Sequence, residues 1–311
     1  MTFDEFRSCW FDADDCVMAH TSGSTGVPKP VRLKKSDMTT SALATCRRFN
    51  IRSGSVLAIP LSADYIAGKM MAVRSFVSGA QLVELHPSRR PLDGYTGRDI
   101  DLLAIVPSQI EGVLNASTTA AIHNIIIGGA PISADQERAL IEAKVNAFAT
   151  YGMTETCSHV ALRRVGDPFY EAMPGITFDT APDGCLIVNV PEMTIGQVVT
   201  RDVVELISPV KFRWLGRADN AINSGGVKLH PELIEKVLTP IMADRQFYIT
   251  SRRSNTWGEE VVMILLDDHP VSPELRQRIA VALPKYSQPK DYINDPHPQY
   301  TSSGKLRRRK L

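Results

Sequence analysis

The sequence predicts an α/β protein: a mainly parallel sheet flanked by helices, then a small antiparallel β unit, then a small α+β domain. Short apolar runs alternate with helical patterns over the first two-thirds of the chain, as in βαβ units. From about Val160 the runs become shorter and carry turn residues between them. A third pattern begins after Arg217, so we expect a boundary at Ala218–Asp219 and domains of residues 1–218 and 219–311.

The first part of the chain is predicted as strands and helices in turn. Its strands are the short apolar runs Cys16–His20, Ser55–Ile59, Gln81–Leu85, Leu102–Val106, Ile122–Ile127 and Val145–Thr150. Its helices have start or stop signals, and are expected from Ser36–Asp37 to Phe49, over Tyr65–Val77 before Gly79, from Pro107, and from a Ser133 cap to Lys144.

The rest of the chain is predicted in two groups. The antiparallel strands are expected at Gly184–Val190, Gln197–Thr200, Val203–Leu206 and Lys211–Leu215. The terminal domain should hold a Gly-Gly hairpin, a helix from Pro231, a strand at Glu260–Leu266, a helix near Pro273–Leu283 and a basic tail.

Composition excludes several classes of protein. Lys plus Arg is 35 and Asp plus Glu is 34, a net charge of +1, which argues against a nucleic-acid binder. No apolar run approaches the roughly 20 residues of a membrane helix, so no membrane insertion is expected. The start is acidic, unlike a secretory signal. The five cysteines are scattered without a CxxC pair, and a reducing cytoplasm is the simplest reading.

A Gly/Ser/Thr-rich loop directly after the first predicted strand is the strongest chemical signal. Its hydroxyls and glycines can turn O–H and N–H donors toward a phosphate, and a lysine adds a point charge. A Walker P-loop does not fit, because Pro28 and Pro30 flank that lysine. A solvated linker is the structural alternative. The candidate phosphate-binding residues are Thr21, Ser22, Gly23, Ser24, Thr25, Gly26 and Lys29.

This loop resembles the phosphate-loop signature TSGSTGxPK of the adenylate-forming superfamily, which includes acyl-CoA synthetases, luciferases and adenylation domains. Tyr151-Gly152-Met153-Thr154-Glu155 resembles the family's YGxTE. The resemblance implies that Tyr151 stacks on the purine, Thr154 bonds the α-phosphate and Glu155 holds Mg²⁺. Gly128, Gly129 and Ala130 would pass the backbone close to the adenine. Alone, each segment would be only a turn at a strand end.

Two further blocks resemble the family in the expected order. Thr200-Arg201-Asp202 is similar to its TGD, with Arg201 in place of Gly, and Asp202 would bind the ribose hydroxyls. Leu215 to Glu232 is similar to the block that starts GRxD. The resemblance implies that Arg217 contacts ribose and phosphate, that Asp219 is the hinge of a mobile C-terminal domain, and that Gly225 and Gly226 face the CoA tunnel.

The C-terminal Ser303-Gly304-Lys305-Leu306-Arg307 is similar to the family's GKxxR, with Arg308 where the final arginine usually falls. Lys305 would reach the carboxylate and α-phosphate during adenylation. A solvated basic tail is the alternative. The chain lacks the large N-terminal subdomain usual in the family. It is either a fragment or a compact member, and Met1 with the amphipathic Phe3–Trp10 stretch favours a natural start.

Two local features resemble the o-succinylbenzoate–CoA ligases of menaquinone synthesis: Tyr65-Ile66-Ala67-Gly68-Lys69-Met70-Met71 with Arg74, and Val106-Pro107-Ser108-Gln109. Tyr65 stands where the family usually has His. The substrate is a dianion, so its second carboxylate needs a buried cation, Lys69 or Arg74. Lys69 also fits a lysine that reaches out from the helix edge. His20 and His159 could line the pocket or be ordinary packed or surface residues.

The resemblance therefore implies an AMP-forming o-succinylbenzoate–CoA ligase. ATP with Mg²⁺ and the acid would give an acyl-adenylate, and the thiolate of CoA would then displace AMP. The partners would be these small molecules, and the oligomeric state stays open, a homo-oligomer included. The alternatives are a ligase for another aromatic or fatty acid, or a non-catalytic nucleotide-binding module.

Overall fold

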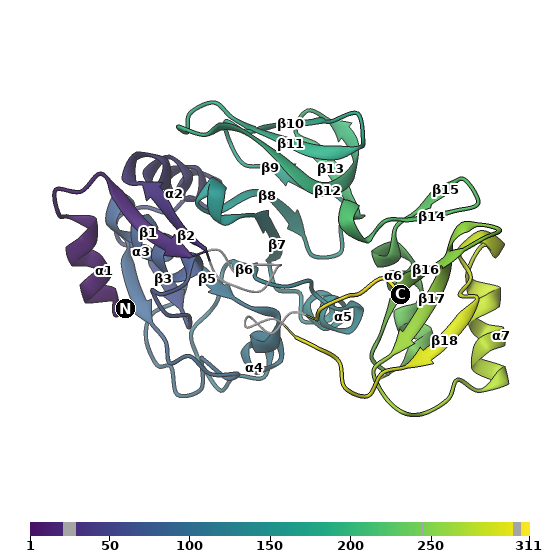
Figure 1. The fold of residues 1–311 in the computed structure, drawn as a ribbon. Coiled ribbons are helices and arrows are strands. Elements are labelled where there is room, and N and C mark those ends of the chain that lie inside the picture. The colour runs from purple at the N-terminus through teal and green to yellow at the C-terminus, as the bar shows by residue number, and fades with distance from the viewer. Residues whose placement is uncertain (21–28, 244, 301–305) are drawn as a thin grey trace.

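The computed structural model describes residues 1–20, 29–243, 245–300 and 306–311 (Figure 1). The described residues form a sheet of 11 strands, a separate pair of strands near the N-terminus and a five-stranded C-terminal sheet. The predicted fold class is confirmed: a parallel sheet flanked by helices, an antiparallel unit and a terminal α+β part. Within the described residues, no helix is long and apolar enough to cross a membrane.

Five strands of the large sheet are parallel, in the order β4-β3-β5-β6-β7. They are β3 (Val56–Ile59), β4 (Gln81–Glu84), β5 (Leu102–Ile105), β6 (Ile125–Ile127) and β7 (Ala147–Gly152). Their connections carry α3 (Ile66–Ser78), the 3₁₀ turn η1 (Pro107–Gln109) with α4 (Ile110–Leu114), and α5 (Ala134–Glu142), while α2 (Lys35–Phe49) precedes them.

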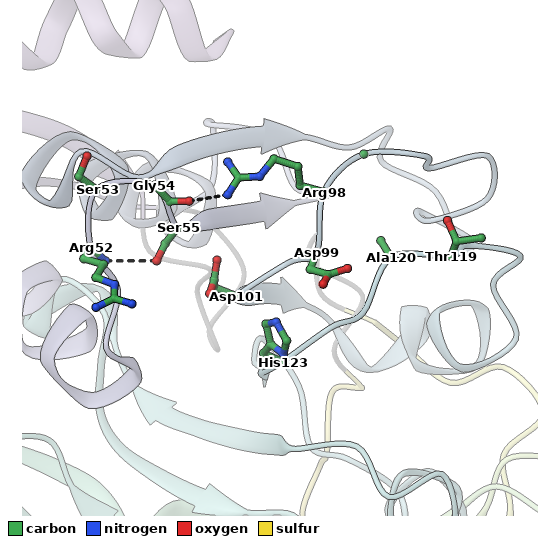
Figure 2. A pocket seen from close by; sticks show the side chains of 11 residues that line it. Arg52, Ser53, Gly54, Ser55, Arg98, Asp99, Asp101, Thr119, Ala120 and His123 are labelled. Atoms are coloured by element: carbon green, nitrogen blue, oxygen red, sulfur yellow. Dashed lines mark hydrogen bonds between the residues drawn. The ribbon is translucent and has the colours of Figure 1, made fainter.

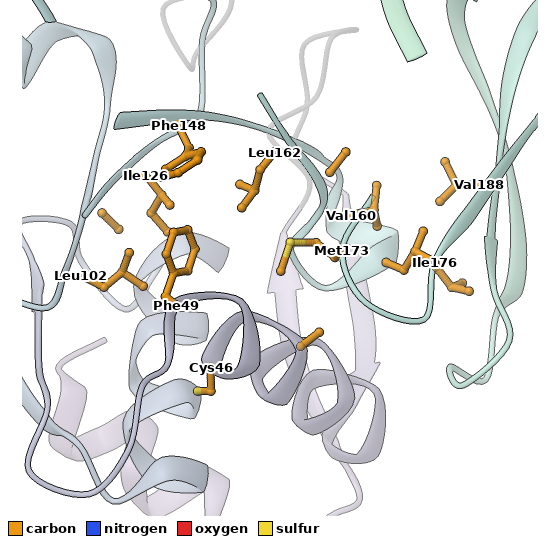
Figure 3. Packing of buried hydrophobic residues seen from close by; sticks show 14 of the residues in the cluster. Cys46, Phe49, Leu102, Ile126, Phe148, Val160, Leu162, Met173, Ile176 and Val188 are labelled. Carbon is orange, nitrogen blue, oxygen red and sulfur yellow. The ribbon is translucent and has the colours of Figure 1, made fainter. Parts of the chain in front are cut away.

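Both faces of this parallel part are buried, because alternate residues of each strand point to opposite sides. Leu102 and Ile126 pack with Phe49 of α2 on one face, as Figure 3 shows, and Leu57 belongs to the same cluster. The opposite face packs in a second cluster, to which α4 and α5 contribute. The continuous apolar strands seen in the sequence therefore follow from helices on two sides.

The structure confirms two of the helix start and stop signals predicted from the sequence and contradicts a third. Ser133 caps α5 in a full capping box, and Gly79 ends α3 with a φ of 72°. The expected cap at Ser36–Asp37 is wrong, because α2 begins one residue earlier, at Lys35. The Asp37 carboxylate instead accepts hydrogen bonds from the backbone N–H and the hydroxyl of Thr194, at 2.9 and 3.0 Å.

The antiparallel strands continue the large sheet beyond β7 rather than forming a layer of their own, in the order β8-β9-β13-β12-β11-β10. Two predicted strands, Gln197–Thr200 and Val203–Leu206, are one strand whose register shifts at Val203/Val204. These six strands are β8 (His159–Arg164), β9 (Tyr170–Ala172), β10 (Thr177–Thr180), β11 (Cys185–Val190), β12 (Gly196–Ser208) and β13 (Lys211–Arg217).

The N-terminal segment forms a small addition to this frame. The predicted strand β1 (Cys16–His20) is confirmed, but it pairs antiparallel with β2 (Pro30–Lys34), which the sequence analysis did not predict, and not with the large sheet. Helix α1 (Phe3–Trp10) starts with a capping box from Thr2. It lies against α3 (Figure 1), with Phe6 fully buried between them.

The C-terminal part has its own sheet, in the order β15-β14-β17-β16, with β18 parallel to β17. The hairpin and both helices are as predicted, whereas β16 and β18 were missed. The elements are β14 (Ile222–Ser224), β15 (Val227–Leu229), α6 (Pro231–Met242), β16 (Phe247–Ser254), β17 (Gly258–Leu265), α7 (Pro273–Ala282), η4 (Lys285–Ser287) and β18 (Asp291–Asn294). Buried residues from Ile222 onward pack in clusters separate from those before Arg217.

Candidate active site

Two glycines at the carboxyl ends of β6 and β7 leave no room for a side chain. A Cβ on Gly128 would lie 2.6 Å from the hydroxyl of Thr150. A Cβ on Gly152 would lie 2.3 Å from the carbonyl oxygen of Ser158 and 2.5 Å from the Cα of His159. Gly129 has a φ of 84°, which favours glycine. The predicted GGA and YG segments thus lie at adjacent strand ends, the edge where open α/β sheets bind ligands.

Asp202 accepts hydrogen bonds from two aromatic side chains at this edge. The Tyr151 hydroxyl donates to its Oδ2 at 2.8 Å and the Trp214 indole to its Oδ1 at 3.1 Å. Burial, followed by the nearby Asp202 charge, raises the pKa of Tyr151 well above its ordinary value, so Tyr151 stays a donor. Arg217 lies 3.7 Å from Oδ1. The structure therefore brings Tyr151, Asp202 and Arg217 together, while their roles in nucleotide binding stay predictions.

Thr154 and Glu155 lie in the 3₁₀ turn η2 (Thr154–Thr156), directly after β7. The buried Thr156 hydroxyl donates to the Met153 carbonyl at 3.0 Å and holds this turn. Glu155 is exposed and makes no hydrogen bond or ion pair with the described residues. It is also in no cluster of three metal-ligating side chains there; the one such group is the exposed Asp14 and Asp15 with the half-buried Cys16. A single carboxylate fits Mg²⁺ held mainly by phosphate and water.

The chain then reverses at Cys157, whose φ is 62°. The Ser158 N–H donates to the Thr156 carbonyl at 2.7 Å, which closes a γ-turn with a buried thiol at its centre. Burial raises the pKa of the Cys157 thiol to about 12, so it is an inert side chain at neutral pH. The turn leads Ser158 and His159 back toward α3.

Arg74 of α3 is buried at 2% exposure, and its Nη2 donates to the Ser158 hydroxyl at 2.8 Å. Its Nε has no partner, and it forms no salt bridge within the described residues. The His159 ring lies 3.2 Å from the Thr45 hydroxyl and 3.4 Å from the Ser158 hydroxyl. Burial lowers the pKa of Arg74 to about 10, and burial with the Arg74 charge keeps the pKa of His159 well below its ordinary value.

At neutral pH this cluster therefore holds one positive charge, on Arg74, that no carboxylate of the described residues pairs with. The sequence pattern indicated Arg74 as a candidate and left two possibilities for His159, but nothing in it indicated a role for Ser158 or Thr45. The only sequence signal for Ser158 was its place just after the YGMTE motif.

The other predicted acid-binding residues are not brought into this cluster. Tyr65 is 67% exposed at the start of α3. The buried Lys69 ammonium donates to the carbonyls of Ala63 and Asp64 and lies 5.7 Å from the Phe6 ring centre. The Gln109 amide donates to the Ser88 carbonyl at 2.8 Å, so it supports a loop.

Asp219 lies in the 3₁₀ turn η3 (Ala218–Asn220) that joins β13 to the C-terminal part. Its Oδ1 accepts from Arg201 and its Oδ2 from Arg217, at 2.9 and 3.1 Å. These two hydrogen bonds, with Arg201 the larger effect, lower the pKa of Asp219. The predicted hinge residue is thus bonded to the last strands of the large sheet.

Several predicted residues lie elsewhere or beyond the description. Lys29 is exposed just before β2, and Ala130 is exposed after the Gly128–Gly129 turn. Gly225 and Gly226 form the β14–β15 turn with φ of 57° and 81°, and the Gly225 N–H donates to the Trp257 carbonyl at 2.9 Å. The remaining candidates lie outside the described residues: Thr21, Ser22, Gly23, Ser24, Thr25, Gly26 and Lys305.

A cavity of about 660 Å³ lies at the opposite edge of the sheet, before β3, β5 and β6 (Figure 2). Its charged groups already serve the fold. Arg98 donates to the Gly54 carbonyl at 2.8 Å, and Asp101 accepts from the Val56 N–H at 2.7 Å. None of the predicted site residues lines it, so it is separate from the candidate active site.

Solved structures share this fold. An acyl-CoA synthetase (AMP-forming)/AMP-acid ligase II-like protein from Dyadobacter fermentans matches with a TM-score of 0.66 and 29% identity, over 97% of this chain and 90% of that one. The o-succinylbenzoate coenzyme A synthetase from Bacillus subtilis, in complex with ATP and magnesium ion, matches with a TM-score of 0.77 and 21% identity, over 94% of this chain and 68% of that one.

Curated proteins that are similar in sequence are also named as acid–CoA ligases. The 2-succinylbenzoate–CoA ligase of Enterococcus faecalis is 24% identical over 92% of this chain and 67% of its own length. A probable 2-succinylbenzoate–CoA ligase of Mycobacterium tuberculosis is 26% identical over 90% of this chain and 79% of its own length. The chain thus spans about two-thirds to four-fifths of these relatives. The family model described as AMP-binding enzyme matches residues 4–193, more than half of the chain. The chain therefore belongs to the AMP-binding enzyme family, as its motifs predict.

Proposed function

We propose that this chain is an o-succinylbenzoate–CoA ligase of menaquinone biosynthesis, acting in the cytoplasm with ATP, Mg²⁺ and CoA. The names of its relatives support an acid–CoA ligase, and the Arg74 cluster supports an acid with a second negative charge. That buried cation, which has no carboxylate partner in the part of the chain that the structure describes, is the observation that carries the proposal.

A buried charge without a partner is costly, and a carboxylate at hydrogen-bond distance offsets much of that cost. Arg74 offers a planar donor set whose Nε is still without a partner. The Ser158 hydroxyl, which accepts from Arg74, has an O–H of its own to donate. The ring carboxylate of o-succinylbenzoate matches this set, while its aliphatic carboxylate would extend toward the α-phosphate for adenylation.

The chemistry has two steps. In the first, the aliphatic carboxylate attacks the α-phosphorus of ATP and pyrophosphate leaves, and Lys305 would neutralise charge on the reacting oxygens. Tyr151 would stack on the purine, Asp202 and Arg217 would bind the ribose, and Thr154 would bond the α-phosphate. Mg²⁺ would supply charge neutralisation on the phosphates, held on the protein side by Glu155. In the second step the CoA thiolate attacks the acyl carbon and AMP leaves.

Two domains, residues 1–218 and 219–311, would change their relative orientation at Asp219 between these steps. The separate packing of buried residues on either side of η3 supports this division. Removal of Lys305 and access of CoA along Gly225 and Gly226 would then accompany one rotation.

The experiment is ATP–pyrophosphate exchange with the purified chain across a panel of acids. We expect o-succinylbenzoate to give the highest kcat/KM, ahead of benzoate, succinate and medium-chain fatty acids. A higher kcat/KM for a monocarboxylate would refute o-succinylbenzoate as the substrate, but the chain would still be an acid–CoA ligase. Exchange with none of them, in a chain shown to be folded, would favour the non-catalytic module.

A further inference from the structure

Arg201 departs from the family's usual glycine, and its guanidinium has a specific partner. It lies on β12 between Thr200 and Asp202, 18 residues before Asp219. Its Nε and Nη2 both donate to Asp219 Oδ1, at 3.2 and 2.9 Å. Asp219 is also the only salt-bridge partner of Arg201 within the described residues.

Arg217 holds the other oxygen of the same carboxylate. It donates from Nη2 to Asp219 Oδ2 at 3.1 Å, and its Nη1 lies 3.7 Å from Asp202 Oδ1. The neighbouring strands β12 and β13 thus hold the Asp219 side chain on both of its oxygens. Arg217 also faces the candidate ribose site, whereas Arg201 serves Asp219 alone.

We propose that Arg201 is a positioning residue that acts through Asp219 to favour the observed orientation of the C-terminal domain over the alternative one. The inference rests on the two-step function proposed above. A rotation about φ of Asp219 moves its carboxylate relative to β12, and the two hydrogen bonds from Arg201 are then lost; the rotation is therefore placed at φ. A glycine at this position has no such bonds, so of the two arginines only Arg217 would still hold the Asp219 carboxylate.

The exposure of the Arg201 and Asp219 side chains limits how far this ion pair can shift the balance between the two orientations. The side chains of Arg201 and Asp219 are 59% and 53% exposed, so solvent and salt screen their attraction. One exposed ion pair changes an equilibrium by about two- to fivefold. Arg201 is therefore expected to tune the populations of the two orientations, not to lock one of them.

The test compares Arg201→Ala with Arg201→Lys and a matched control, Arg213→Ala. Arg213 forms a 3.0 Å ion pair with Glu205 across the same two strands, at similar exposure and away from η3. Each variant is assayed for adenylate formation by pyrophosphate exchange and for thioester formation from supplied acyl-adenylate and CoA. Hydrogen exchange of residues 218–221 is measured in parallel at low salt.

We expect Arg201→Ala to change the ratio of the two half-reaction rates by about two- to fivefold, one rate rising while the other falls. Exchange at 218–221 should speed up, Arg201→Lys should lie between, and Arg213→Ala should match the parent in both readouts. Equal loss of both half-reactions, or exchange no faster than in Arg213→Ala, would overturn the proposal. A parent chain inactive in both half-reactions would refute the proposed function, and the exchange comparison would still decide the role of Arg201.

Discussion

Replacing Arg74 by methionine should separate substrate recognition from folding. The guanidinium is 2% exposed and donates to Ser158, and no carboxylate of the described residues pairs with it. If it pairs with the ring carboxylate, its removal leaves that charge buried and unpaired, at a cost of about 3–5 kcal/mol. At 1.36 kcal/mol per decade, kcat/KM for o-succinylbenzoate should fall by about 150- to 5,000-fold.

Unlike kcat/KM, the free energy of unfolding should stay unchanged or rise in Arg74→Met. Apolar replacement of buried charges is often neutral or stabilising by about 1–4 kcal/mol, so Arg74→Met should not lower the urea midpoint of unfolding. A loss of activity without a loss of stability would indicate that Arg74 contributes to substrate binding and not to the stability of the fold. Circular dichroism during urea titration measures this directly.

The assay compares two acids that differ by one group: o-succinylbenzoate and 4-oxo-4-phenylbutanoate, which lacks the ring carboxylate. Arg74→Met should narrow the ratio of their kcat/KM values toward one, because the second acid has no charge to lose. Lys69→Met is the control, since the Lys69 ammonium already donates to the Ala63 and Asp64 carbonyls. An unchanged ratio in Arg74→Met, or a narrowed one in Lys69→Met alone, would refute the reasoning.

Three other outcomes are expected. Lys305→Ala should abolish pyrophosphate exchange and spare thioester formation from supplied acyl-adenylate, and equal loss of both would contradict its role in one step. Asp219→Pro should keep adenylate formation and impair CoA transfer, because proline fixes φ near −65°, whereas Asp219→Ala should retain both reactions with their ratio shifted, as in Arg201→Ala. His159 has a pKa below 6.5 in the folded chain, so below about pH 6.5 the unfolded state binds a proton that the folded state does not. Stability should therefore fall as the pH drops toward 5.5, by up to about 1.4 kcal/mol per unit, and less steeply in His159→Gln; parallel profiles by urea unfolding would exclude His159 as the cause.

The parallel part of the fold was predictable because its signals are local. Strands such as Leu102–Ile105 are short apolar runs, and α5 has the capping box of Ser133. Missed elements had weaker patterns. Strand β16 ends in Ser-Arg-Arg-Ser, and β2 begins with Pro30 directly after the glycine-rich segment. The sequence alone also could not show that β1 pairs with β2 instead of joining the large sheet, since that choice depends on long-range pairing.

Part of the candidate site was also predictable from local motifs, and part of it depends on long-range contacts. Tyr151, Asp202 and Arg217 were found from motifs, and the structure brings them together. The Arg74 cluster depends on contacts between α3, α2 and the start of β8, which lie far apart in the sequence. Single-residue patterns could not tell Arg74 from Lys69, because both lie on one apolar helix. Their difference is the partner that each side chain meets: a hydroxyl for Arg74 and backbone carbonyls for Lys69.

The reversal at Cys157 has a consequence for how new specificities could arise. Residues 151–159 form one short hairpin that carries Tyr151 at one end and Ser158 with His159 at the other, and Gly152 touches the backbone of both latter residues. Under the proposed function, the purine end and the acid end of a single intermediate thus meet the same short segment. A change of acid could exchange the side chains at 158 and 159, but any shift of their backbone would also displace the nucleotide. Selection for another acid would then act first through α2 and α3, which can alter the pocket wall without moving that segment.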